Sequence, residues 1–155
     1  MIKNSLKHFA RLAAVQALYQ VEVNGQNSEF VVQEFKRYRL KEFVIGKEEM
    51  VVDEALFSEI VTNVGREVCR LDERVQKVLA GGWKISRLDP TSRALLRAAC
   101  YELDQKSPVP ARVIIKEYVD ISGNFSGKTE TAFVNAALDA LAREIRCNEM
   151  LQEHS

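Results

Sequence analysis

Residues 83–103 read WKISRLDPTSRALLRAACYEL and contain a strong signal for the start of a helix. An aspartate such as Asp89 accepts hydrogen bonds from free backbone amides, and Pro90 at the first helical position loses no hydrogen bond. Apolar side chains then recur at three- and four-residue steps, which predicts an amphipathic helix. These side chains are Leu95, Leu96, Ala99, Cys100 and Leu103. The helix is expected to end at Ser107, because Pro108 disfavours a helical residue before it.

The same helical spacing continues through most of the N-terminal half of the chain. A first stripe extends from Leu6 to Val21, and Gly25 is expected to end that helix. Ser28 is predicted to cap a second, short helix. Residues 39–52 lose the pattern and are predicted to form a loop, with only a weak strand signal at residues 43–45.

The remaining segments are bordered by capping residues, glycine or proline. Asp53 is predicted to cap a long segment that ends at residues 81–82, with a break allowed at Asp72. Pro110 is predicted to open a short helix, residues 123–127 a turn, and residues 129–146 the last helix. We therefore expect an all-α fold, a compact helical bundle of about seven helices without a sheet.

The length of 155 residues suits one domain with one core. We expect residues 1–155 to form a single helical domain with flexible tails at 1–4 and 147–155. The basic, Ala- and Leu-rich N-terminus is interrupted by Arg11 and Gln16, so we expect a helix of the mature protein and not a signal peptide. No apolar run approaches the roughly 18 residues that span a membrane, and we expect a cytoplasmic protein.

The charges balance, with 22 Lys and Arg against 22 Asp and Glu. A zero net charge gives no general attraction to nucleic acid, so an RNA site requires a local patch. One basic run precedes the first acid and consists of Lys3, Lys7, His8 and Arg11; a second consists of Lys84, Arg87, Arg93 and Arg97. Most such runs are solvated helix faces, and they bind ligands only where the fold gathers them on one surface.

The sequence lacks the groupings that catalysis or metal binding requires. Cys69, Cys100 and Cys147 contain no C-x-x-C pair, and His8 and His154 lie at opposite ends of the chain. A zinc site or disulfide framework is therefore not expected, and reduced, mostly buried thiols are the simpler interpretation. We expect no catalytic residues, no metal and no cofactor, and hence a binding protein and not an enzyme.

Residues 126–129 read SGKT and resemble the end of a phosphate-binding loop. That motif needs an earlier glycine where this chain has Ser122, and a strand before the loop. A nucleotide site is therefore discounted. A helix N-terminus can still hold a single phosphate weakly, which makes Lys128 a candidate RNA contact.

Four segments resemble the family of the bacterial transcription antitermination factor NusB. They are ARLAAVQALYQ at 10–20, the stretch 83–103, VPARVIIKE at 109–117 and FVNAALDALA at 133–142, in the family's order and spacing. The resemblance implies two stacked helical bundles. It also implies binding to the boxA element of nascent ribosomal RNA together with NusE, a small-subunit ribosomal protein, in a complex that joins other Nus factors and RNA polymerase.

The resemblance also implies which residues meet RNA. NusB proteins carry an arginine-rich N-terminus, but this chain has Lys7, His8 and Phe9 where arginines are frequent, so weaker phosphate binding is expected. Further departures lie near the expected RNA site, with Lys116 for asparagine, Ala136 for glycine and Thr129 for aspartate. The candidate RNA-binding residues are Lys3, Lys7, His8, Arg11, Tyr19, Lys128 and Phe133.

Aromatic and polar candidates each have a structural alternative. Tyr19 and Phe133 are as suited to core packing as to stacking on bases, whereas Tyr101 is expected in the core. Asn135 beside an apolar stripe is interpreted as a buried capping or bridging group. For NusE, the helix opened by Asp89 is the expected docking element, with Arg93 and Arg97 exposed on it.

Two alternative functions remain open at this stage. The first is the NusB-like RNA-binding module of a ribosomal RNA methyltransferase, although 155 residues are expected to leave no room for a catalytic Rossmann-like domain. The second is a structural dimerisation module that binds no RNA. The sequence leaves open whether the chain forms a homodimer.

Overall fold

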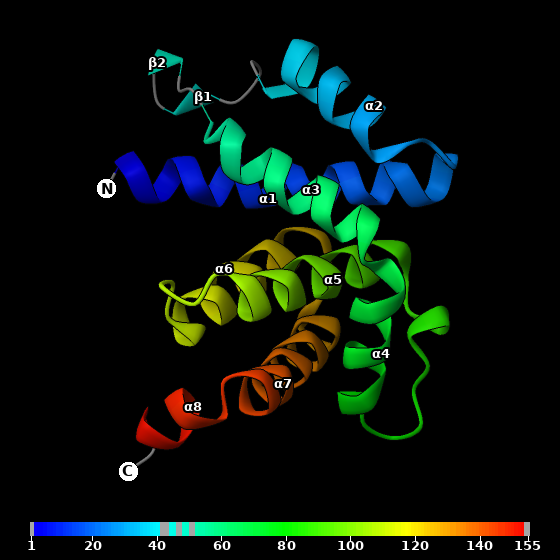
Figure 1. Ribbon diagram of the computed structural model, residues 1–155, viewed down its shortest axis with the longest axis vertical. Coiled ribbons are helices and arrows are strands. Elements are labelled where there is room, and N and C mark those ends of the chain that lie inside the picture. Colours follow the sequence, from blue (N-terminus) through cyan, green and yellow to red (C-terminus); the bar gives the residue numbers. More distant parts are fainter. Residues whose placement is uncertain (1, 41–43, 46–47, 50–51, 154–155) are drawn as a thin grey trace. The chain divides into compact units, whose positions relative to one another are not determined.

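The computed structural model describes residues 2–40, 44–45, 48–49 and 52–153 (Figure 1). Apart from one short pair of strands, the regular elements in these residues are helices, so the predicted all-α class is confirmed. The residues gather into two compact units, Met1–Arg66 and Glu67–Ser155. The expectation of a single domain stays a prediction. No helix in the described ranges combines the length and the hydropathy needed to cross a membrane.

The first unit is built on one long helix. Its elements are α1 (Ile2–Asn24), α2 (Ser28–Glu34), the π-helix η1 (Phe35–Arg39), β1 (Val44–Ile45), β2 (Glu48–Glu49) and α3 (Glu54–Arg66). Both α2 and α3 pack against α1 and against each other. The Phe35 and Phe57 rings stack with centroids 5.5 Å apart, which joins η1 to α3. At Gly65 an added Cβ would collide with the Ser28 hydroxyl oxygen, so a larger residue here would require Ser28 to move.

Helix ends in the first unit follow the predicted capping logic, with one shift. Gly25 ends α1 in the left-handed conformation, at φ +64°, and the Asp53 carboxylate accepts a hydrogen bond from the Leu56 amide at 3.0 Å. The cap of α2 is Asn27, whose side chain accepts from the amides of Glu29 and Phe30. The prediction of Ser28 is wrong, because the extended backbone that a cap requires lies at Asn27 and Ser28 is already helical.

A small ladder contradicts the expectation that the chain has no sheet. Val44 pairs with Glu49 and Ile45 with Glu48 in an antiparallel arrangement. Two short extended segments can satisfy their backbone groups by pairing with each other in this way. Residues 41–43, 46–47 and 50–51 of the predicted loop lie outside the described residues.

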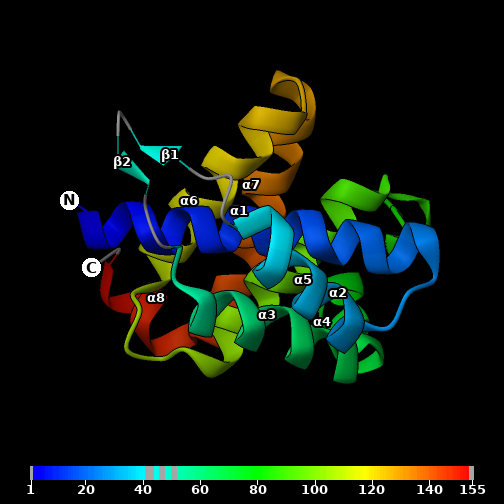
Figure 2. The same ribbon diagram turned by 90° about the horizontal axis from the view of Figure 1, so that it is seen from above.

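The second unit is organised around α5. Its elements are α4 (Val68–Val78), the 3-10 turn η3 (Ile85–Arg87), α5 (Pro90–Gln105), α6 (Ala111–Phe125), α7 (Lys128–Ile145) and α8 (Cys147–Glu153). Contacts join α5 to α4, α6 and α7, and α6 and α7 lie side by side (Figures 1 and 2). Asp89 caps α5 as predicted, through the Ser92 amide. The helix break falls at Glu67 and not at Asp72.

The C-terminal end contains a helix where the sequence suggests a flexible tail. Arg146, 9% exposed, donates hydrogen bonds to the backbone carbonyls of Leu103 and Lys106 and pairs with Glu149 on α8. The buried guanidinium therefore satisfies carbonyls at the end of α5 that lack helical partners. Met150 is also buried, which supplies the apolar contact that holds α8. The turn predicted at 123–127 is also shorter than expected, because α6 continues to Phe125.

Candidate nucleic-acid interface

The basic run on α1 presents less charge to solvent than its sequence suggests. Lys7 is exposed, but Arg11 is only 3% exposed, and the side chain of Lys3 lies outside the described residues. His8 is half-buried and its ring contacts Phe9 edge to face, with centroids 5.8 Å apart. Lys7 is therefore the cation of this run that is available to a phosphate in the described part of the chain.

Tyr19 lies on the same helix and is 42% exposed. Val23, one turn further, is 50% exposed, so this end of α1 presents an apolar surface. The alternative that Tyr19 is a core residue is wrong, because a packed core tyrosine such as Tyr101 is only 5% exposed. Twelve residues separate Lys7 from Tyr19, which corresponds to about 18 Å along a helix axis.

Two candidates in the second unit, Lys128 and Phe133, lie on different flanks of α7. Their separation of five residues rotates one about 140° from the other at 3.6 residues per turn. Lys128 lines a pocket shared with α6, whereas the Phe133 ring lies 5.9 Å from that of Trp83, which precedes η3. They therefore belong to two separate surfaces.

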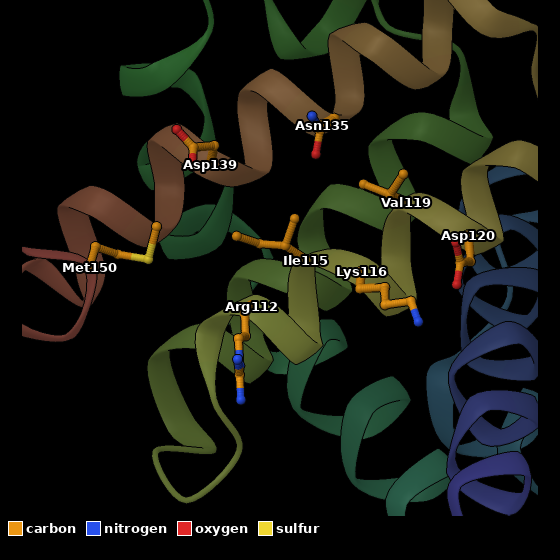
Figure 3. Close-up of a pocket in the computed structure, with 8 residues that line it drawn as sticks. All are labelled: Arg112, Ile115, Lys116, Val119, Asp120, Asn135, Asp139 and Met150. Atoms are coloured by element: carbon orange, nitrogen blue, oxygen red, sulfur yellow. The ribbon is translucent and has the colours of Figure 1, made fainter. Parts of the chain in front are cut away.

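The surface that includes Lys128 is a groove between α6 and α7. One pocket of about 500 Å³ is lined by Val119, Gly123, Ser126, Gly127, Lys128, Thr131, Ala132 and Asn135. A second, of about 340 Å³, is lined by Arg112, Ile115, Lys116, Val119, Asp120, Asn135, Asp139 and Met150 (Figure 3). Because Val119 and Asn135 line both, the pockets adjoin, and together they are called the α6–α7 groove.

Polar groups stand on both edges of the α6–α7 groove. Arg112 and Lys116 extend from α6, while Asn135 and Asp139 project from α7 (Figure 3). The Asp139 carboxylate accepts a hydrogen bond from Arg143 at 2.8 Å, so part of its charge is already compensated. The whole lining holds three cations, Arg112, Lys116 and Lys128, against two carboxylates, Asp120 and Asp139. The excess of one positive charge, together with the Arg143 pairing of Asp139, favours a ligand with phosphates.

Asn135 is exposed within this groove, so its interpretation as a buried bridging group is wrong. Its amide can donate and accept at once, which is the pattern needed to read the edge of a base. Arg112, Lys116 and Asn135 were missed as a group by the sequence analysis. The available signal was the four-residue spacing of Arg112 and Lys116, which places both on one face of α6.

The two arginines expected to meet a partner protein are held within the chain. The Arg93 guanidinium donates hydrogen bonds to the carbonyls of Ile85, Ser86 and Leu88 at 2.7–3.3 Å. Arg97 makes a bidentate pair with Asp72, and its side chain is 13% exposed. The expectation that α5 exposes both is therefore wrong, because α4 supplies a carboxylate and η3 supplies carbonyls to this face.

Further charges join α4 to α5. Asp104 pairs with Arg70 at 3.0 Å and with Arg74 at 3.2 Å. Although burial acts to raise the pKa of this carboxyl, hydrogen bonds from Gln105 and Arg70 and the nearby Arg74 charge lower the pKa overall, below its usual 3.8. Burial also raises the pKa of the Cys100 thiol, on the same helix, to about 12.

The thiols do not suggest a chemical site. Cys100 is buried, but Cys69 and Cys147 are exposed, so the expectation of mostly buried cysteines is wrong. Both exposed cysteines lie at the first turns of helices on the outside of the second unit. Within the described residues no cluster of three His, Cys, Asp or Glu side chains could hold a metal ion.

Comparison with known proteins gives a consistent family. The model of the NusB family matches residues 8–143. A transcription antitermination protein NusB from Caulobacter vibrioides is 44% identical over 137 residues, covering 88% of this chain and 92% of the relative. One from Rhodopseudomonas palustris (strain BisB18) is 42% identical over 140 residues, covering 90% and 83%.

A solved structure shares the fold. The T. maritima NusB structure superposes with a TM-score of 0.73 at 25% identity, and the match covers 88% of this chain and 90% of that one. The helical arrangement described above is therefore one already seen in an experimentally determined protein.

Proposed function

Because this chain belongs to the NusB family of transcription antitermination factors, we propose that it binds the boxA element of nascent ribosomal RNA together with NusE. In this proposal the chain acts without catalysis, in the cytoplasm, where RNA is transcribed. It joins RNA polymerase indirectly, through the complex with NusE and the other Nus factors. The names of the relatives state antitermination only. We propose in addition that this chain binds boxA RNA and NusE.

The observation that carries the proposal is the composition of the α6–α7 groove. Exposed Asn135 lies among three cations, Arg112, Lys116 and Lys128, and two acids, Asp120 and Asp139, so a group that reads base edges is accompanied by a majority of groups that attract phosphates. Phosphate contacts position an RNA, and base contacts give the sequence preference. This combination fits a specific single-stranded RNA, whose phosphates can meet the cations and whose unpaired bases can meet Asn135.

A second contact is proposed on α1, in the first unit. Lys7 would meet a phosphate, His8 would contact the RNA beside it, and exposed Tyr19 would stack on a base. Lys3 belongs to the same proposed run. Arg11 is buried, so in this proposal it acts on the RNA through its charge and not by direct contact.

NusE is expected to strengthen RNA binding because the chain has no net charge. A second RNA-binding protein on the same RNA raises the apparent affinity, since its contact forms at a high effective concentration. Both guanidinium groups are hydrogen-bonded within the chain, so Arg93 and Arg97 would not contact NusE directly. They would instead maintain the shape of the surface that NusE contacts.

The test is a titration of fluorescently labelled boxA RNA at one salt concentration. The protein is added alone, with NusE, and with NusE to a scrambled RNA of the same composition. We expect the affinity for boxA RNA to rise at least about tenfold with NusE, as linked contacts allow, and the scrambled RNA to bind more weakly. Equal affinity for both RNAs, with and without NusE, would contradict the proposal and leave a non-specific RNA binder. Binding of neither RNA would favour a structural module.

A further inference from the structure

Trp83 is a large apolar side chain that the structure leaves half in solvent, at 51% exposed. It is the chain's single tryptophan. Its ring lies 5.9 Å from the ring of Phe133 on α7, with the two planes inclined by 60°. Single exposed hydrophobic residues are common and need no explanation, so the surroundings of this pair decide its meaning.

The backbone that carries Trp83 is held in place on both sides of the ring. Gly81 and Gly82 turn the chain with φ of +68° and +75°, where other residues are strained. The Gln76 amide then donates to the Trp83 carbonyl and accepts from the Ile85 amide, each at 2.9 Å. The Gln76 side chain therefore links the end of α4 to the start of η3.

A second set of hydrogen bonds holds the segment from Ile85 to Leu88. Arg93 on α5 donates to the carbonyls of Ile85 and Leu88, so η3 is tied to α5. Trp83 is thus presented by an ordered backbone and is not the side chain of a frayed loop. A ring fixed before binding loses little conformational entropy when a ligand stacks on it.

Charge on this loop indicates what stacks there. Residues 80–88 contain Lys84 and Arg87, both exposed, and no acidic residue. An exposed aromatic ring beside cations is an arrangement that binds single-stranded nucleic acid, in which bases stack on rings and phosphates meet Lys and Arg. A peptide-binding surface gains nothing from the two cations unless the peptide is acidic.

We propose that the exposed Trp83 ring, supported by the inclined ring of Phe133, is a stacking platform for an unpaired base of single-stranded RNA, with Lys84 and Arg87 meeting the adjacent phosphates. The inference rests on the proposed function, because the RNA is the same molecule. It adds a separate contact, since Phe133 lies on the opposite flank of α7 from the α6–α7 groove. The platform and the groove therefore contact different nucleotides.

The single tryptophan makes the platform directly observable. Its intrinsic fluorescence should be quenched as single-stranded boxA RNA is added to the whole chain, with or without NusE, and should stay unchanged with the same RNA annealed to its complement. Trp83→Ala should weaken single-stranded RNA binding about tenfold, within the range for loss of one stacked base, without changing the salt slope. Trp83→Phe should retain most of the affinity, because it keeps a ring.

Matched variants separate the platform from other effects. Tyr38→Ala removes an aromatic side chain that is 62% exposed in the first unit, and should leave RNA affinity unchanged. Lys84→Gln with Arg87→Gln should flatten the salt dependence, which Trp83→Ala does not. Circular dichroism of each variant establishes that the helices are intact before binding is measured.

Three outcomes would overturn the platform. If RNA binds without quenching and Trp83→Ala binds it as tightly as the parent, the platform is wrong while RNA binding at the α6–α7 groove stands. If Trp83→Ala loses NusE and keeps RNA affinity, the surface is a protein-docking site. If no RNA binds the parent alone or with NusE, the platform and the proposed function fail together.

Discussion

Arg97 on α5 donates two hydrogen bonds to Asp72 on α4, from Nε to Oδ1 at 2.7 Å and from Nη2 to Oδ2 at 2.8 Å. The two side chains are 13% and 25% exposed, so the pair is largely removed from water. A planar guanidinium held by both carboxylate oxygens fixes distance and orientation at once. The pair therefore sets how α4 lies on α5, and with it the position of the Trp83 turn that follows α4.

Removing one partner of this pair should destabilise the second unit. We expect Arg97→Ala to lower the free energy of unfolding by about 1–3 kcal/mol, because Asp72 is left partly buried without its partner. Urea denaturation followed by circular dichroism measures the loss. The double variant with Asp72→Ala should cost less than the sum of the single changes. Strict additivity would show that the two side chains do not interact.

Lys7 and Arg11 should behave differently although they lie one helical turn apart. Lys7→Gln should weaken binding of every RNA sequence and reduce the slope of log K against log salt by about 0.7, the value for one single-strand phosphate contact. Arg11→Ala should instead lower the unfolding temperature, because its buried side chain is lost. Exposed Arg37→Gln on η1 serves as the charge control. An unchanged slope in Lys7→Gln would make this face an ordinary solvated one.

At the α6–α7 groove, Asn135 should contribute to the preference for one RNA sequence, whereas Lys116 should contribute to the affinity for any RNA. Asn135→Ala should reduce the preference for boxA over scrambled RNA by about fivefold or more, as expected for loss of a hydrogen bond to a base. Lys116→Gln should weaken both RNAs equally. Glu144→Gln, an exposed change elsewhere on α7, is the control. If Asn135→Ala leaves the preference intact, this side chain does not read a base.

Asp104 should make stability depend on acidity. Its folded pKa lies below 3.8, so its ion pairs with Arg70 and Arg74 contribute stability that is complete above the unfolded pKa and is lost as the pH falls through the folded pKa. Denaturation midpoints measured from neutral pH down to about pH 3 should therefore fall more steeply for the parent than for Asp104→Asn. Parallel curves for the two proteins would assign the acid sensitivity to other carboxylates.

The sequence by itself determined several of the points where helices begin and end. Asp89, Asp53 and Gly25 act through their own side chain or backbone conformation, which needs only a few neighbouring residues. Periodicity likewise marked the apolar faces of the helices that were predicted, and motif order identified the family. The α2 cap was misplaced by one residue because Asn27 and Ser28 are both good capping residues, and only the backbone distinguishes them.

Tertiary structure alone decided which polar and aromatic residues reach solvent. Helical spacing gives the angle of Arg11, Arg97 or Phe133 around its own axis, but not which element covers that angle. Asp72 lies across from Arg97, and Trp83 lies beside Phe133, because α4 and the turn after it pack against α5 and α7. Those neighbours are distant in sequence, so the charge runs and aromatic candidates were visible in advance, while their exposure depended on contacts that form only when the chain folds.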